Sequence, residues 1–480
     1  MKPPPPRTSA VFEGGVRSFR AAARFGARPE ASSIPTTFPT SSSYAPPRLG
    51  RPGGSLAPAR DPNLRRYRSR VLSRRLLAPL CALLLLLVLP AGASALDRAT
   101  VGRSFDRWIA RSGATYSGAF VRDLTTGEAL YAARADRPRI PASVEKLFTT
   151  AAALGTLVPT GHLQTRVART GTLDRGALDG DLLLIGGGDP TLGADDLQRL
   201  AREVRRAGIR RVSGSVIGDE SRFDGLRGGP RTSGAADVDM SGVLGALTIN
   251  RGYAARPGGP ALAAARRFAR ALRARGVRVS GRTTTGEAPL DAEPIAAAAS
   301  PSILELAQTT NITSDNFYAE TLLKALAAQE SAPARTALGA SVARSALLGM
   351  GVSPGTIADG SGLSRRNTVT ARQVVGLLAR MHASDLGPAF ESTLAVAGRT
   401  GTLRRRLIGT SAEGACRGKT GTLRDVSTLA GYCRTLEGHV VAFAILLNGV
   451  NVSAAHAAQD RAVAVLARYM SRPLGRKLFG

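Results

Sequence analysis

The spacing of apolar residues predicts helices in some segments of the chain and strands in others. Five segments have the pattern of helices, and they cover residues 98–113, 139–157, 300–330, 370–384 and 452–470. Residues 115–136 instead predict two strands around a Thr-Gly turn. Helices and strands are therefore both expected near the two ends of the chain.

The last part of the chain is rich in strand-forming residues. The segments 416–425, 426–435 and 439–450 predict three antiparallel strands, followed by the amphipathic segment 452–470. A cluster of helices beside an antiparallel sheet is the architecture that this order favours. We therefore expect an α+β fold.

Residues 163–300 differ from the sequence on either side. Short strands and many glycines surround two predicted helices, at about 194–207 and 259–275. We interpret this region as an insertion of small α/β domains into the main domain. The expected limits are 96–165 for the first part of the main domain, 166–299 for the insertion and 300–480 for the second part.

An export pattern lies near the start of the chain. Arg74-Arg75 precedes an apolar run at 76–90, and Ala93-Ser94-Ala95 supplies small residues at both positions of a cleavage site. This order is typical of a secretory signal peptide, which we predict at 71–95. A retained membrane anchor is the alternative, although the run is short for a bilayer. In both cases the rest of the chain leaves the cytoplasm, to an extracytoplasmic location.

Residues 1–70 are rich in Pro, Ser, Gly and Arg and show no periodicity. Such a composition predicts disorder. Because a signal peptide rarely follows so long a stretch, we expect a start site that is assigned too early, with Val71 as one candidate for the initiator.

The net charge of +30 is unevenly distributed. Residues 1–95 contain 15 Lys or Arg and 3 Asp or Glu, a net of +12, which leaves +18 for the remainder. The remainder has no lysine cluster, zinc-finger spacing or aromatic-basic motif, so we expect no nucleic-acid partner. A solvated basic surface, or association with an anionic cell envelope, explains the charge instead. The four histidines lie far apart, and no metal or other cofactor is expected.

The chain has three cysteines, and Cys81 lies within the apolar run. The remaining pair, Cys416 and Cys433, suggests a disulfide in an exported protein. A hairpin whose loop is Arg424-Asp425 places the two cysteines opposite each other, within disulfide reach. Two buried free thiols are the alternative, and a bulge or a longer loop would point the two sulfurs to opposite faces.

Ser143 and Lys146 lie three residues apart, in a chain with 5 lysines and 60 arginines. At the start of a helix this spacing puts both side chains on one face, with Cβ atoms about 5–6 Å apart. A serine hydroxyl becomes a good nucleophile only when a base removes its proton. Lysine can be that base when burial and a second cation lower its pKa, whereas arginine stays protonated.

Two further motifs complete a trio with this pair. They are Ser314-Asp315-Asn316, at the start of a predicted helical stretch, and Lys419-Thr420-Gly421-Thr422, on a predicted strand. Ser314 can relay a proton between Lys146 and a leaving amine. Asn316 can hold the amide of the substrate.

The residues of the strand motif have complementary tasks. Lys419 favours a neutral Lys146 and attracts a substrate carboxylate, to which Thr420 and Thr422 offer hydroxyl groups. Gly421 keeps the strand edge open for the substrate backbone. The N–H groups of Ser143 and Thr422 can form an oxyanion hole.

With these motifs the sequence resembles the low-molecular-mass penicillin-binding proteins of the D-alanyl-D-alanine carboxypeptidase/endopeptidase type with a large insertion. The resemblance runs from about residue 100 to 470 and includes further segments: GGGDPTL, GDESRF, SDNFYAE, DGSGLSRRN and GTLRRR. It implies a penicillin-binding-protein/β-lactamase-like domain interrupted by the insertion. It also implies that peptidoglycan stem peptides are the substrates and that β-lactam antibiotics bind.

One feature of the family has no clear match. Its members can recognise the side chain of the stem peptide with an acidic residue of the insertion and an arginine of the GSGLS loop. Arg365 fits the arginine, whereas Asp237 and Asp239 are both candidates for the acidic residue, and a solvated loop is the alternative for both.

The leading hypothesis is an exported serine enzyme that forms an acyl-enzyme on Ser143 and acts as a D-alanyl-D-alanine carboxypeptidase or endopeptidase. A β-lactamase-like hydrolase is less favoured, because the gap between the first two motifs is long and no glutamate after Asn316 has an asparagine four residues later. A non-catalytic cell-wall-binding protein is the third possibility, and the intact trio argues against it.

Overall fold

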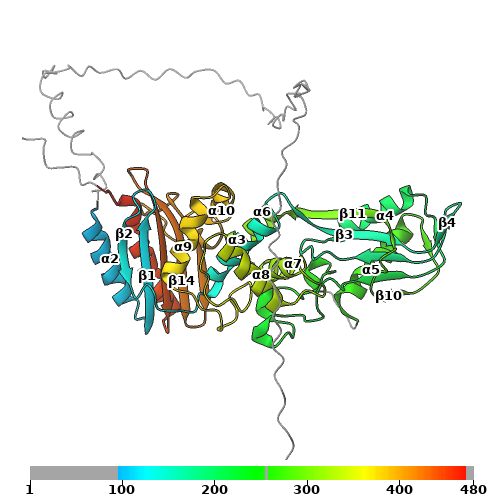
Figure 1. Ribbon diagram of the computed structural model, residues 1–480, viewed down its shortest axis with the longest axis horizontal. Helices are drawn as coiled ribbons and strands as arrows, with labels where there is room; N and C mark the ends of the chain where they lie inside the picture. The colour runs from blue at the N-terminus through cyan, green and yellow to red at the C-terminus, as the bar shows by residue number, and fades with distance from the viewer. Residues whose placement is uncertain (1–95, 254–257, 472–480) are drawn as a thin grey trace, which may run out of the picture. The chain divides into compact units, whose positions relative to one another are not determined.

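A six-stranded antiparallel sheet forms the centre of the main domain, in a computed structural model that describes residues 96–253 and 258–471 (Figure 1). Its strand order is β12-β13-β14-β15-β1-β2. The strands are β1 (Tyr116–Asp123), β2 (Ala129–Ala133), β12 (Ala395–Val396), β13 (Cys416–Leu423), β14 (Val426–Arg434) and β15 (Val440–Asn448). The expected hairpin at 115–136 and the three strands near the C-terminus are confirmed.

Helices cover both faces of this sheet. On one face, α2 (Arg98–Arg111) and α11 (Val452–Ala464) contribute Phe105 and Val463 to a core shared with alternate residues of β15. On the other face, α9 (Ala371–His382) packs against the remaining residues of β15. Every residue of β15 is therefore buried, which explains its nearly continuous apolar sequence.

A second group of helices packs beside the sheet and carries two of the three motifs. It consists of α3 (Lys146–Thr156), α6 (Ile303–Ile312), α7 (Asn316–Ala327), α8 (Thr336–Gly349) and α10 (Gly387–Ser392). The single helical stretch expected at 300–330 is interrupted between α6 and α7. Ser314 has a left-handed backbone there (φ +65°), and Asp315 caps α7 by accepting a hydrogen bond from Tyr318 N at 3.0 Å.

Two smaller sheets are built from the middle of the chain. The strands of the five-stranded sheet, in spatial order, are β10 (Thr283–Thr285), β8 (Val216–Asp219), β6 (Leu182–Ile185), β3 (His162–Arg169) and β11 (Glu293–Ser302). Those of the four-stranded sheet are β4 (Thr172–Asp174), β5 (Ala177–Asp179), β7 (Arg211–Val212) and β9 (Arg278–Val279). The expected limits of the insertion, 166 and 299, lie just inside the range of these strands.

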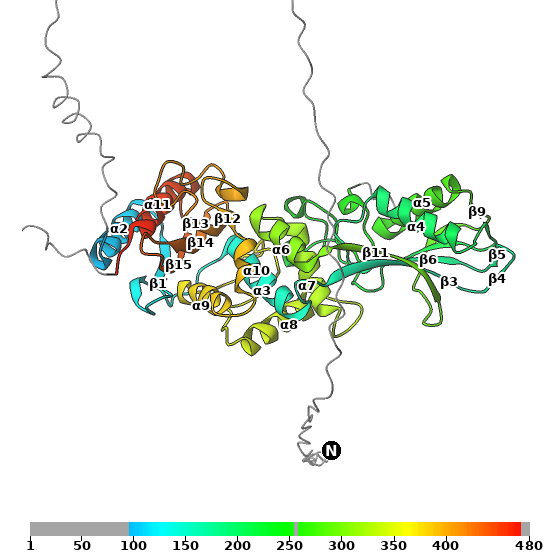
Figure 2. The same cartoon turned by 90° about the horizontal axis from the view of Figure 1, so that it is seen from above.

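The two helices expected in the middle region are confirmed as α4 (Ala194–Arg206) and α5 (Gly259–Ala274). Both lie on the same side of strands β3, β6 and β11 (Figure 2). Their apolar stripes share a core with Val167 of β3 and Leu184 of β6.

The expectations for residues 1–70 and for the signal peptide at 71–95 lie outside the described residues. Within 96–253 and 258–471, no helix has both the length and the apolar character needed to cross a membrane.

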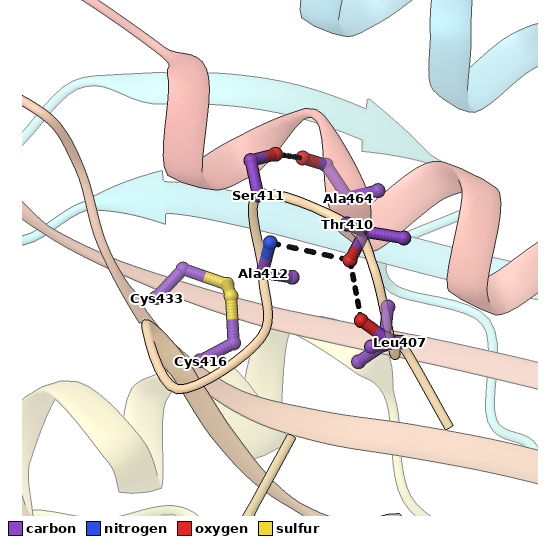
Figure 3. Close-up of a disulfide and its surroundings, with 7 residues drawn as sticks. All are labelled: Leu407, Thr410, Ser411, Ala412, Cys416, Cys433 and Ala464. Carbon is purple, nitrogen blue, oxygen red and sulfur yellow. Dashed lines mark hydrogen bonds between the residues drawn. A yellow bond between two sulfur atoms is a disulfide. The ribbon is translucent and has the colours of Figure 1, made fainter. Parts of the chain in front are cut away.

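The register predicted for the last hairpin is confirmed. Leu423 pairs with Val426, and the same register places Cys416 opposite Cys433 with Cα atoms 4.0 Å apart. A disulfide joins the two side chains (Figure 3). The bond lies beside a loop in which Ser411 Oγ donates a hydrogen bond to Ala464 O at the end of α11. It therefore ties the strand with the Lys-Thr-Gly motif to its neighbour.

We predict that the Cys416→Ser/Cys433→Ser double variant has a free energy of unfolding lower by about 3 kcal/mol, because the bond closes a short loop. Denaturant titration of both proteins measures the difference.

A second prediction concerns the thiols themselves. A protein that begins at residue 96 should show no free thiol when denatured without reductant, and two thiols per chain would exclude the bond.

Candidate active site

The candidate nucleophile lies in a tight turn immediately before a helix. Ser143 belongs to the 3₁₀ turn η1 (Ala142–Glu145), and Lys146 is the first residue of α3. Ala142, just before the serine, has a positive φ of 46°, which is unusual for alanine and indicates a strained turn. The sequence predicted the shared face correctly: the amine of Lys146 lies 2.9 Å from Ser143 Oγ.

The amine of Lys146 is fully buried and has three hydrogen-bond partners. Besides Ser143 Oγ, they are Asn316 Oδ1 and the carbonyl oxygen of Ser361, both at 2.6 Å. The two carbonyl oxygens can only accept hydrogen bonds, so they take the two N–H groups of a neutral amine. Its lone pair is then left for the hydroxyl of Ser143, which is the arrangement of a base poised to remove that proton.

Burial is the main reason why the amine can be neutral. It lowers the pKa of Lys146 to about 8, against the opposing effect of nearby carboxylates. Those carboxylates are Asp359, Glu320, Asp315 and Glu145. None of the acids forms an ion pair with Lys146 among the residues described, so all three direct partners of the amine are uncharged groups.

The Ser-Asp-Asn motif reaches the site from the junction of α6 and α7. Asn316 links two parts of the chain, because its Oδ1 accepts from Lys146 while its Nδ2 donates to Asp239 O at 2.6 Å. Asp315 forms an ion pair with Arg251 at 2.5 Å. Ser314 is half-buried, and it is not among the hydrogen-bond partners of Lys146 in this conformation. Its expected relay role therefore stays a prediction.

Sequence reasoning named the segment 359–367 but missed that the backbone of this loop contacts Lys146. Glu320 of α7 is completely buried, and its Oε1 accepts from the N–H groups of Gly360 (2.9 Å) and Ser361 (2.7 Å). Asp359 in turn accepts from Gly362 N and Ser364 N within the loop. These bonds fix the carbonyl of Ser361 that Lys146 contacts. Both segments, SDNFYAE and DGSGLSRRN, were noted in the sequence, but the sequence does not show that they contact each other.

Lys419 lies on β13 and is also completely buried. Burial, and then the charge of Lys146, lower its pKa well below the ordinary value. Its amine donates to Thr420 O at 2.8 Å, and no carboxylate pairs with it among the described residues. A buried lysine without a counter-charge is suited to receive a substrate carboxylate, because the anion would stabilise its charged form.

The structure gives a different reason for glycine at position 421, Gly421, from the one expected. A Cβ atom at this position would lie 2.7 Å from Pro141 O and 2.8 Å from Ser143 N, so the glycine allows β13 to pack against the nucleophile turn. The strand edge is free as well: β12 pairs with β13 only at Arg417 and Gly418. An extended peptide could therefore add to β13 from Lys419 onward.

A cavity of about 740 Å³ adjoins these motifs. Asn316, Thr422, Asp239 and Arg365 are among its lining residues. Thr422 is exposed, whereas Thr420 is buried and donates a hydrogen bond to Thr402 of the GTLRRR segment at 2.8 Å. The structure thus brings Ser143, Lys146, Asn316 and the strand motif to one site and opens it to solvent.

The candidate specificity residues lie at the rim of this cavity. Arg365 is exposed and forms an ion pair with Asp425. Asp237 is not in a solvated loop: its side chain is 1% exposed and forms an ion pair with Arg231 that holds its pKa below the ordinary value. Asp239 is 58% exposed and lines the cavity, so it is the more accessible of the two acids.

The sequence matches a known family over most of the main domain and the insertion. The model of the D-Ala-D-Ala carboxypeptidase 3 (S13) family matches residues 106–255 and 231–469. A D-alanyl-D-alanine carboxypeptidase of Actinomadura sp. (strain R39) is 33% identical over 439 residues, which cover 74% of this chain and 81% of that protein. A carboxypeptidase of Mycobacterium tuberculosis is 31% identical over 359 residues, 68% of this chain and 75% of the relative.

The fold is similar to that of penicillin binding protein 4 from Haemophilus influenzae. The TM-score is 0.68 at 21% identity, and the match covers 76% of this chain and 99% of the other. A second structure of that protein, in complex with a β-lactam, has a TM-score of 0.64 and covers the same shares. The expected α+β, penicillin-binding-protein-like fold is confirmed.

We predict that acylation by a penicillin becomes faster as the pH rises through about 8, because only the neutral amine of Lys146 accepts a proton. Lys146→Arg keeps the charge but should lower the rate above pH 8 by roughly a hundredfold, in the range of general-base losses, and should remove the rise with pH. Stopped-flow acylation between pH 6 and 10 measures both effects. A rate within twofold of wild type in the arginine variant would contradict this role.

We also predict that Glu320 positions Lys146 and sets the pH at which it becomes a base. Glu320→Gln keeps an acceptor for both N–H groups but removes a carboxyl group whose charge raises the pKa of Lys146. Burial raises the pKa of Glu320 itself to about 8, so its charge develops in the same pH range in which Lys146 becomes neutral. The midpoint of the pH profile should therefore fall in this variant.

Glu145→Gln is the matched control for this test. Burial raises the pKa of Glu145 well above the ordinary value, and among the four acids its charge has the smallest effect on the pKa of Lys146. Its amide should therefore move the midpoint less than Glu320→Gln does. Equal midpoints in wild type and Glu320→Gln would show that Glu320 has only a structural role.

Proposed function

This chain belongs to the D-Ala-D-Ala carboxypeptidase 3 (S13) family and is a serine-type carboxypeptidase, and we propose that it cleaves peptidoglycan stem peptides through an acyl-enzyme on Ser143. The observation that carries the proposal is the contact of the buried amine of Lys146 with Ser143 Oγ and two carbonyl oxygens. No cofactor is needed for this chemistry.

Acylation starts when Ser143 Oγ attacks the carbonyl carbon of the penultimate D-alanine. The hydroxyl proton passes to Lys146, and the N–H groups of Ser143 and Thr422 stabilise the oxyanion. The C–N bond then breaks, and the leaving amine takes the proton from Lys146 through Ser314. D-Alanine leaves, and the acyl group stays on Ser143 as an ester.

Deacylation repeats the proton transfers with a new nucleophile. Water attacks the ester carbonyl and gives one proton to Lys146, which returns it to Ser143 Oγ as the C–O bond breaks. The same steps on a cross-linked stem peptide, where the leaving amine belongs to another stem, would be the endopeptidase reaction. The free edge of β13 supports both substrates, because it leaves room for an extended backbone.

The strand motif and the rim of the cavity hold the rest of the substrate. Lys419 binds the terminal carboxylate together with Thr420 and Thr422, and Asn316 holds the amide of the stem peptide. Arg365 and Asp239 contact the end of the stem side chain. The exposure of both groups supports this assignment.

The place of action follows from the substrate and from the export pattern at 71–95. We propose an extracytoplasmic enzyme. β-Lactams would acylate the same serine, as the complex of the Haemophilus influenzae relative with a β-lactam suggests.

We predict that a fluorescent penicillin attaches covalently to the wild-type protein and that Ser143→Ala abolishes this attachment, because the ester forms on Ser143 Oγ. The measurement is gel fluorescence of the denatured protein. Absence of label on the wild-type protein would refute an acyl-enzyme and would favour a non-catalytic wall-binding role. Rapid turnover of the penicillin with release of its hydrolysed product would instead favour the β-lactamase-like alternative.

A further inference from the structure

The five-stranded sheet has one face that α4 and α5 do not cover. Both helices lie on the same side of the sheet (Figure 2), where they bury Val167 of β3. Because side chains alternate along a strand, Gln164 and Arg166 point to the opposite side. Both residues are exposed.

A cavity of about 780 Å³ lies over this second face. Gln164, Arg166 and Ile185 contribute to it from the sheet, and Arg222 and Gln329 contribute from the segments beside it. Its wall also includes Thr156 and Leu157, at the end of α3. A helix of eleven residues is about 16 Å long, and Ser143 precedes the opposite end of α3, so this cavity is separate from the catalytic site.

Two arginines in the cavity lack a carboxylate partner. The guanidinium of Arg222 makes one weak contact, Nη2 to Ala328 O at 3.4 Å, and its buried Nε has no hydrogen-bond partner among the residues described. The side chain of Arg166, unlike its backbone in β3, forms no hydrogen bond or ion pair within the same part of the chain. Arg166 and Arg222 line the same cavity, and burial, followed by the charge of Arg166, lowers the pKa of Arg222.

The acidic residues of the same wall do not neutralise this pair. Asp219 is buried, and its two oxygens accept from Ser221 N (2.7 Å) and Ala288 N (2.9 Å). Glu287 is exposed and forms no ion pair with either arginine in the described structure. Two cations that line one cavity, one of them with a buried unpaired N–H group, are costly unless an anion binds to them.

We propose that this cavity is a second binding site, at which Arg222 and Arg166 hold a carboxylate of the peptidoglycan polymer away from the cleavage site. Guanidinium groups pair well with carboxylates through two parallel hydrogen bonds. The inference rests on the proposed function, because stem peptides supply free carboxylates all along that polymer. The site would add affinity for the polymer and none for a short peptide.

The test compares a short stem peptide with intact peptidoglycan freed of phosphate-containing polymers. Arg166→Gln and Arg222→Gln should leave D-alanine release from the short peptide and labelling by penicillin unchanged. Sedimentation with intact peptidoglycan, and D-alanine release from it, should fall about tenfold in each variant, the loss expected for a hydrogen-bonded charge. Arg166 is exposed, so its replacement does not threaten folding.

Arg211→Gln is the matched control, because Arg211 is an exposed arginine of β7 that does not line the cavity. It should bind intact peptidoglycan like wild type.

Equal binding by all three variants would overturn the proposal. A loss seen only with phosphate-containing walls, or competition by inorganic phosphate alone, would overturn the carboxylate assignment. A wild-type protein that sediments with peptidoglycan but releases no D-alanine would contradict the proposed function and leave this site standing.

Discussion

The site depends on one constraint: the amine of Lys146 is buried among uncharged acceptors. An amine at the surface would be protonated at neutral pH and could not remove a proton from serine. Here burial lowers its pKa to about 8. Of the groups in direct contact with the amine, the side chain of Ser143 has the hydroxyl proton that a neutral amine can accept. The surrounding carboxylates oppose this effect, so the chemistry depends on a balance between desolvation and charge.

The fold maintains this arrangement by close packing of backbone around the nucleophile turn. A Cβ atom on Gly421 would lie within 2.8 Å of Ser143 N, and one on Gly362 would lie 1.9 Å from Ala142 O. The turn is thus held between β13 on one side and the 359–367 loop on the other. Such confinement can sustain the positive φ of Ala142, which an isolated chain would relax.

Much of this arrangement could be predicted from the sequence. The trio of motifs pointed to Ser143 and Lys146 because a hydroxyl and an amine are side-chain groups that can perform the proposed chemistry. The register of the last hairpin followed from a two-residue loop and a period of two. Backbone groups could not be predicted in the same way: the carbonyls of Ser361 and Asp239 contact the site, and any residue type supplies a carbonyl. The left-handed backbone conformation of Ser314 could not be predicted either, because serine rarely adopts it.

The protonation state of Lys146 is the central claim, and it can be measured directly. The chain has only 5 lysines, so ¹⁵N-lysine labelling gives few side-chain NMR signals, and Lys146→Arg assigns the one of interest. The account predicts that the Nζ signal of Lys146 titrates near pH 8, where its amine becomes neutral. A signal showing that the amine stays protonated up to the ordinary lysine pKa, about 10.4, would contradict this account.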